Sequence, residues 1–484
     1  MYKSKLTLSS AIIINSILTC LFIMLFYVVD SGHTLSVFKI ISLFSINIVP
    51  VFVILYMFNT KKTIDINFNN IIFFFGIFYT LYFILPFYIV IFFLNTITDI
   101  NLLIISSLIT VGFICFSFGI KYIMKNSIDI FANKNFNQKE SVPLLIICVM
   151  LILLVIYYWI WRINNNIFYN QAFFYEQSPN LLSSFRDVFI QSTILPLIVL
   201  LGLLNKSSSP RILKFAKFIF ISYSISTIIL YTLSSQTRPA ITAILLFIAS
   251  LQIFTKVKIK IFKSIMLLIF GIVIIVSIQG QRHIFNQNLV NSRNQFVTAT
   301  NNIFQSTTQA FLFSQIFVGD VSNRASGNIL FLSDIIDKTN EKGYLYGEGI
   351  FLTLEGLIPR VLYNNKPVIT SPQIIVKSLL GLPLEDDSLT AINQFYVEFG
   401  FMGIIVGFFT LGYFLAKYLI YLSKKNTLAP FIFFSFIISQ LILMELELIT
   451  GLLGALRNAA VVYIFYIIIK FFVGGTKYGN GKII

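Results

Sequence analysis

Long apolar stretches recur along almost the whole chain, and this pattern limits what the chain can fold into. A membrane-spanning helix needs about 20 mostly apolar residues. Only 11% of the 484 residues are charged, against about 25% in a soluble domain. The sequence therefore predicts an all-α polytopic membrane protein with about 12 transmembrane helices. Their centres fall near residues 18, 47, 82, 110, 151, 195, 225, 247, 270, 406, 438 and 463.

Residues 281–390 interrupt this pattern, because they contain no clear span and gather many of the polar residues. Within them, Ser371 and Pro372 suit the N-cap and first position of a helix that continues through Leu380. The apolar content of the segment indicates short helices packed on the membrane mouth rather than a flexible linker, and a structured segment of this length is usually functional. The predicted organisation is nine helices in 1–280, this loop, and three helices in 391–484.

The distribution of basic residues predicts the orientation of the chain. If the N-terminus is cytoplasmic, 22 of the 35 Lys and Arg residues fall in inner segments, 5 in short outer segments and 8 in residues 281–390. Short cytoplasmic loops carry such an excess of positive charge. We therefore expect both termini in the cytoplasm and residues 281–390 outside. Lysines beside anionic lipid account for the net charge of +16, so no nucleic acid partner is expected.

Arginine and lysine follow opposite patterns. In this topology 21 of 26 lysines lie inside, whereas eight of nine arginines lie outside. The guanidinium group offers a planar fork of donors that suits phosphate and carboxylate. The outer arginines therefore favour binding of an anionic ligand with a lipid tail. Pairing with outer acids stays open as the alternative, and for Arg457 an ion pair with Glu445 or Glu447 is favoured.

Two blocks of sequence resemble the O-antigen polymerases. The first spans residues 344–367, where Gly-Glu-Gly is followed by Ile358–Arg360 and by Lys366–Pro367. The second reads Tyr-Val-Glu-Phe-Gly at 396–400. The turn at 236–239, Gln-Thr-Arg-Pro, is similar to the short arginine turn of that family, although the family more often has Arg-Gly there. These enzymes join lipid-linked oligosaccharide repeat units outside the cytoplasmic membrane, and they share the plan of many spans with one late outer loop.

The resemblance implies a glycosyltransferase without cofactor or metal ion. A hydroxyl of one lipid-linked unit attacks the anomeric carbon of the growing chain, and polyprenyl diphosphate leaves. Arginines fixed at the interface would stabilise the developing charge, and an acid would deprotonate the hydroxyl. The implied partners are the lipid-linked oligosaccharides, membrane lipids and, as an open point, a chain-length regulator protein. The expected diphosphate-binding residues are Arg238, Arg282, Arg360 and Lys366, and the expected catalytic residues are Arg360, Glu348, Glu398 and His283.

Two other functions stay open at the level of sequence. A flippase or transporter of lipid-linked sugars needs charged or broken helices at the membrane midplane, and the predicted spans carry almost no charge in their centres. An O-antigen ligase shares the outer loop and uses outer arginines and a histidine, which keeps His283 under consideration. Motifs of zinc proteases, serine hydrolases and P-loop enzymes are absent. The acidic run Glu385–Asp387 fits a solvated turn better than a metal–diphosphate clamp.

Overall fold

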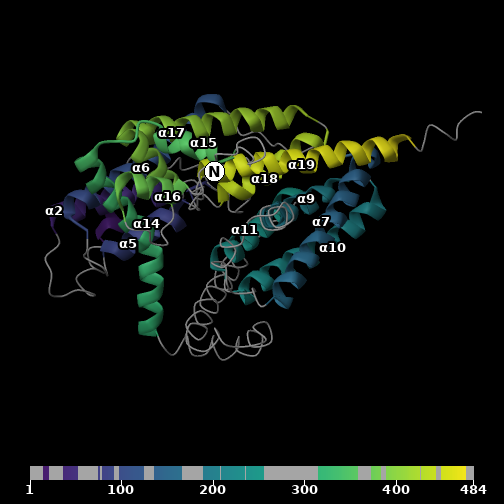
Figure 1. Ribbon diagram of the computed structural model, residues 1–484, viewed down its shortest axis with the longest axis horizontal. Coiled ribbons are helices and arrows are strands. Elements are labelled where there is room, and N and C mark those ends of the chain that lie inside the picture. The colour runs from purple at the N-terminus through teal and green to yellow at the C-terminus, as the bar shows by residue number, and fades with distance from the viewer. Residues whose placement is uncertain are drawn as a thin grey trace, which may run out of the picture. The chain divides into compact units, whose positions relative to one another are not determined.

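The computed structural model (Figure 1) is almost entirely helical where it describes the chain. In those residues the structure contains no strand, only one isolated bridge between Phe136 and Ser207. The all-α prediction is therefore confirmed for the described part of the chain. The described residues are 15–20, 36–52, 75–76, 79–91, 97–124, 136–165, 189–207, 209–234, 236–255, 314–357, 372–382, 389–425, 427–442 and 448–475.

Five helices are long and apolar enough to cross a membrane, as expected of a helical membrane protein. They are Asp99–Ile123, Lys139–Asn164, Pro210–Leu233, Ala391–Lys424 and Gly451–Val473. Shorter apolar helices occupy Val37–Phe52, Gln191–Lys206, Pro239–Leu251 and Ala429–Leu441. Each of these helices coincides with a predicted span. The count of about 12 stays a prediction, because the centre near 82 falls on short helical pieces, the centre near 18 is described only over 15–20, and the centre near 270 lies outside the described residues.

The chain forms two compact units, and each draws on both halves of the sequence. Unit 1 comprises Met1–Ile130, Val321–Tyr421 and Met444–Gly451. Unit 2 comprises Phe131–Asp320, Leu422–Leu443 and Leu452–Ile484.

Unit 1 contains most of the segment that interrupts the apolar pattern. Its α16 begins and ends where the sequence predicts, at Pro372 and Leu380, although Ser371 lies outside the described residues. Its α14 is a 29-residue helix, which is longer than the short helices expected in this segment. The helices of unit 1 are α2 (Val37–Ile46), η2 (Thr80–Ile84), α5 (Leu85–Ile89), α6 (Asp99–Ile123), most of α14 (Ser314–Lys342), α15 (Glu348–Leu357), α16 (Pro372–Leu380) and most of α17 (Ala391–Lys424).

Helices α6 and α17 pack with their backbones in close contact. A Cβ atom at Gly119 of α6 would overlap the carbonyl oxygen of Phe409, and one at Gly412 of α17 would overlap the carbonyl oxygen of Phe116. Membrane helices reach this separation where small residues line the crossing, because lipid offers little hydrophobic drive for helix association. These glycines therefore fix the approach of α17 to α6.

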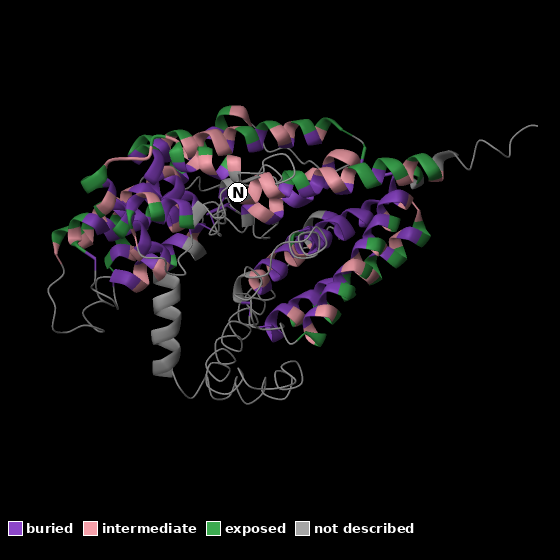
Figure 2. Ribbon diagram, in the orientation of Figure 1, coloured by how far each residue is buried: buried purple, intermediate pink, exposed green. Residues whose placement is uncertain are grey.

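Unit 2 is built around α9. Every residue of α9 from Thr193 to Leu203 is buried, and α9 is purple over most of its length in Figure 2. Helices α7, α10, α11 and α18 all pack against it, as expected for a helix that is apolar on all sides. The helices of unit 2 are α7 (Gln138–Asn164), α9 (Gln191–Leu203), η6 (Leu204–Lys206), α10 (Pro210–Leu233), α11 (Thr237–Thr255), α18 (Ala429–Ile442) and most of α19 (Leu448–Gly475).

Candidate active site

The two sequence blocks singled out above, residues 344–367 and 396–400, meet in unit 1. The backbone N–H of Leu345 donates to the carbonyl oxygen of Val397 over 3.0 Å, and that of Tyr346 donates to the carbonyl oxygen of Glu398 over 2.9 Å. Consecutive residues of one block therefore bond to consecutive residues of the other. We call this pairing of residues 344–349 with 396–400 the joint.

A kink in α17 makes the joint possible. Phe399 has φ −138° and ψ 16°, and Gly400 has φ 60° and ψ −141°, so the helix is interrupted between its first two turns and its long arm. The carbonyl oxygens of Val397 and Glu398 just before this kink accept the bonds from the other block. Gly400 has the positive φ that glycine adopts without steric cost. A Cβ there would also lie 2.6 Å from the ring of Tyr344.

The side chain of Glu398 caps the N-terminus of α15. Its Oε2 accepts a hydrogen bond from the backbone N–H of Gly347 over 2.8 Å, next to the first turn of a helix whose N–H groups have no partner within the helix. A carboxylate is stabilised there by the helix dipole. Glu398 is only 1% exposed, and its Oε1 makes no hydrogen bond in the described part of the chain. Glu398 thus holds α15 against α17.

The glycines on either side of Glu348 have separate structural reasons. Gly347 has φ +97°, a conformation that is costly for residues with a side chain. Gly349 lies against the capping carboxylate, and a Cβ there would overlap Oε1 of Glu398. The Gly-Glu-Gly sequence is therefore what allows a buried glutamate to reach this helix end.

The structure brings two predicted catalytic acids together and gives them different environments. Glu348 is the first residue of α15 and is exposed. Glu398 is buried under the same helix turn, where its Oε2 accepts the hydrogen bond from Gly347. An exposed carboxylate can receive a proton from a bound ligand, whereas a buried one that accepts a backbone hydrogen bond is suited to holding the loop in place.

The structure does not describe the side chains of the other predicted site residues. Arg238 is the second residue of α11 in unit 2, and only its backbone is described. Arg282, His283, Arg360 and Lys366 lie outside the described residues, as does the acidic run Glu385–Asp387. The expected grouping of arginines around a diphosphate therefore stays a prediction. Within the described ranges, no three His, Cys, Asp or Glu residues form a group that could hold a metal ion.

Two of the arginines that are predicted to lie outside have partners within unit 2. Arg162 is 2% exposed; its Nη1 donates to the hydroxyl of Tyr158 over 3.1 Å, and its guanidinium lies 5.5 Å from the ring centroid of Trp159. Arg457 donates from Nε to Oδ1 of Asn458 over 3.4 Å. The acids expected to pair with Arg457 lie outside the described residues. Arg162 is thus enclosed by aromatic side chains, which its place in the sequence did not indicate.

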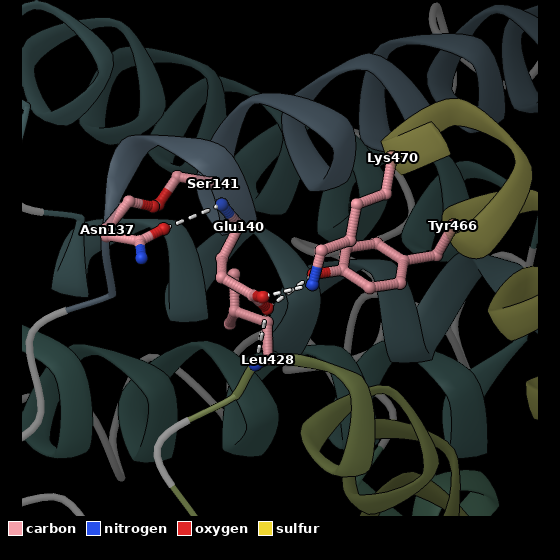
Figure 3. A network of polar contacts seen from close by, with 6 residues as sticks. All are labelled: Asn137, Glu140, Ser141, Leu428, Tyr466 and Lys470. Atoms are coloured by element: carbon pink, nitrogen blue, oxygen red, sulfur yellow. Dashed lines mark hydrogen bonds and ion pairs between the residues drawn. The ribbon is translucent and has the colours of Figure 1, made fainter. Parts of the chain in front are cut away.

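The strongest polar network in unit 2 surrounds Glu140, near the start of α7 (Figure 3). Its Oε2 accepts from the hydroxyl of Tyr466 over 2.5 Å and from the backbone N–H of Leu428 over 3.1 Å, and its Oε1 forms an ion pair with Lys470. Each oxygen of the carboxylate thus has a donor, and the network ties α7 to α19 and to the start of α18. We interpret it as structural, since no polar atom of the carboxylate is left over for a ligand.

Three tyrosines of the two blocks, which the sequence suggests as sugar-stacking residues, form a row at the joint. The rings of Tyr344 and Tyr396 meet edge to face with centroids 5.9 Å apart, and those of Tyr344 and Tyr346 with centroids 6.3 Å apart. Tyr396 is 5% exposed and Tyr346 is 73% exposed, so the row runs from the interior to the surface. The Tyr-Leu-Tyr-Gly run at 344–347 was the available signal, but only the fold shows that Tyr396 joins it.

No protein-family model, curated protein or solved structure matches the chain.

Proposed function

We propose that this protein is a membrane-embedded glycosyltransferase that polymerises polyprenyl-diphosphate-linked oligosaccharide repeat units at the outer face of the cytoplasmic membrane. The observation that supports the proposal is the joint. Two blocks that resemble the O-antigen polymerases pair through backbone hydrogen bonds and one buried carboxylate. Gly347 of the first block and Glu398 of the second are 51 residues apart in sequence. Residues that serve one site are expected to converge in this way.

The proposed reaction forms one glycosidic bond and breaks one bond to diphosphate. A sugar hydroxyl of the incoming lipid-linked unit attacks the anomeric carbon of the growing chain. The bond between that carbon and the diphosphate oxygen breaks, and its electron pair leaves with polyprenyl diphosphate. The hydroxyl proton passes to a carboxylate, for which the exposed Glu348 is our first candidate. Glu398 then acts as a positioning residue, which refines the expectation that both glutamates are bases.

The charge on the leaving diphosphate has to be stabilised by cations. The N-terminus of α15 does not serve this purpose, because the Glu398 carboxylate already occupies it. We therefore assign this role to Arg238, Arg282, Arg360 and Lys366, following the resemblance and the outer distribution of arginine. Fixed guanidinium groups stabilise such charge without a metal ion.

The site requires residues 281–390 to lie outside the membrane, with both termini in the cytoplasm. Reporter fusions after residues 130, 210 and 335 test this topology. The expected result is an inside signal at 130 and 210 and an outside signal at 335. An inside signal at 335 contradicts the site assignment, because lipid-linked repeat units are joined at the outer face.

The polysaccharide of a strain lacking the gene tests the function. If the protein is the polymerase, the chain-length ladder disappears and the acceptor carries a single repeat unit, and the wild-type gene restores the ladder. If it is a ligase, the acceptor carries no unit at all. If it is a transporter, lipid-linked units accumulate on the cytoplasmic side. Only the single-unit product agrees with our proposal.

A further inference from the structure

Tyr346 has a backbone conformation that its side chain disfavours. Its φ is +50°, and it is the only residue other than glycine with a positive φ in the described part of the chain. Glycine or asparagine adopts this region at lower cost than a bulky residue. Strain of this kind persists where the surrounding structure enforces it, and it concentrates at functional sites.

The joint is what enforces this strain. The backbone N–H of Tyr346 donates to the carbonyl oxygen of Glu398, and the next N–H, that of Gly347, donates to the Glu398 carboxylate. Both bonds are made by backbone atoms, so they need no tyrosine side chain. A glycine at position 346 would make the same two bonds.

Packing does not explain the tyrosine either. The side chain of Tyr346 is 73% exposed, and its ring meets the Tyr344 ring edge to face, with an interplanar angle of 90°. A residue with a strained backbone and an exposed side chain contributes little to the stability of the fold. Its flat face is therefore available to a ligand.

Tyr344, which contacts the Tyr346 ring, is itself held in place by its neighbours. Tyr344 lies against Tyr396 at an interplanar angle of 86°, and Tyr396 is buried. The space for the Tyr344 phenol exists because position 400 is glycine. Such fixed side chains lose little conformational freedom when a ligand binds.

The chain around Tyr346 combines an exposed carboxylate with exposed aromatic rings. Glu348 is exposed two residues further along. Phe399 is 46% exposed and Phe351 of α15 is 67% exposed, and a Cβ at Gly347 would lie 3.5 Å from the Phe399 ring. Aromatic rings together with a carboxylate suit a carbohydrate, whose C–H face stacks on a ring and whose hydroxyls donate to carboxylate.

We propose that Tyr346, supported by Tyr344 and flanked by Glu348, forms a glycan-binding subsite for a sugar of the incoming repeat unit. The subsite rests on the proposed function for the identity of its ligand. It places the sugar next to the carboxylate that we propose as base.

The test is glycan binding without turnover. The probe is the delipidated repeat-unit oligosaccharide, released by mild acid from lipid-linked intermediates of the deletion strain. Its affinity for the purified full-length protein in nanodiscs is measured by NMR saturation transfer. We expect Tyr346→Gly and Tyr346→Asn to bind about tenfold more weakly, as for the loss of one aromatic partner, while their melting temperatures rise because the strain is relieved. Tyr346→Phe keeps the ring and restores binding relative to Tyr346→Gly.

Tyr122, which is 63% exposed on α6, provides a matched control, and Tyr122→Ala should bind the probe like the wild type. Equal binding by wild type and Tyr346→Gly overturns the subsite, as does a loss of binding in Tyr122→Ala of the same size. Unchanged glycan binding in Tyr346→Gly, together with weaker binding of a short-chain polyprenyl phosphate, would instead identify a lipid site and also overturn the subsite. Glycan binding that depends on Tyr346 in a protein that does not polymerise would support the subsite and overturn the proposed function alone.

Discussion

Glu398 Oε2 and the backbone N–H of Gly347 are joined by a 2.8 Å hydrogen bond that places a buried carboxylate at the N-terminus of α15. This bond links the kink of α17 to the loop that carries Glu348 and Tyr346. It assigns different roles to two glutamates that sequence alone treats alike. Substitutions of the two glutamates should therefore have different effects.

Replacing Glu398 by Gln should preserve much more activity than replacing it by Ala. The Gln side-chain oxygen still accepts the bond from Gly347, whereas Ala leaves a buried N–H without a partner and removes the cap, at a cost of about 1–2 kcal/mol. We expect activity within about threefold of wild type for Glu398→Gln, and a loss of more than about tenfold with a lower melting temperature for Glu398→Ala. If Glu398 is itself the base, both variants will be equally inactive.

Replacing Glu348 by Gln should abolish turnover without lowering stability. The carboxylate is exposed, so its loss removes few packing contacts, whereas loss of a general base typically lowers the rate about 10²–10⁴-fold. Single-turnover assays and thermal melts of the purified variant check both parts. Glu341→Gln is the matched control, because Glu341 is an exposed acid outside the joint. Nearly full activity in Glu348→Gln would remove this residue from the mechanism.

Replacing Glu140 by Ala should destabilise unit 2 while leaving the joint intact. Three donors lose their acceptor. Breaking a buried pair costs about 3–5 kcal/mol, but the Lys470 side chain is 41% exposed, so we expect about 1–2 kcal/mol. The surviving protein should keep its activity per molecule. Glu341→Ala breaks an exposed ion pair and should not change the melting temperature. Equal melting temperatures for the two variants would contradict the structural role of Glu140.

Arg360→Lys should prevent polymerisation while membrane levels stay normal. Lysine keeps the charge but loses the planar fork that binds two diphosphate oxygens at once. Chain-length ladders from a deletion strain complemented with the variant, with protein levels checked by blot, provide the measurement. If Arg360 instead pairs with Glu348 or Glu355, the substitution will be mild and a charge-swapped double variant will recover activity.

Much of the fold follows from local sequence. The nine apolar helices coincide with predicted spans because length and composition suffice to recognise them. The helix Pro372–Leu380 was predicted from its proline at the first position. In each case the signal lies within a stretch of neighbouring residues.

The joint depends on contacts that local sequence does not encode. The two segments that form it are far apart in sequence, and the hydrogen bonds between them depend on a helix kink at Phe399 and Gly400. The difference between an exposed Glu348 and a buried Glu398 arises only after α15 docks on α17. The same holds for Glu140, whose partners come from residues 428–470. Residue type suggested acid–base chemistry for Glu348 and Glu398, whereas their burial decides their separate roles.

The most direct test of the account is elongation by the purified protein. The full-length protein in nanodiscs is incubated with lipid-linked repeat units in the presence of a chelator, and products are separated by chain length. Our account predicts a ladder that grows by single repeat units, with one polyprenyl diphosphate released per bond formed. Repeat units that stay unjoined under conditions in which they bind, with or without added divalent metal, would contradict it.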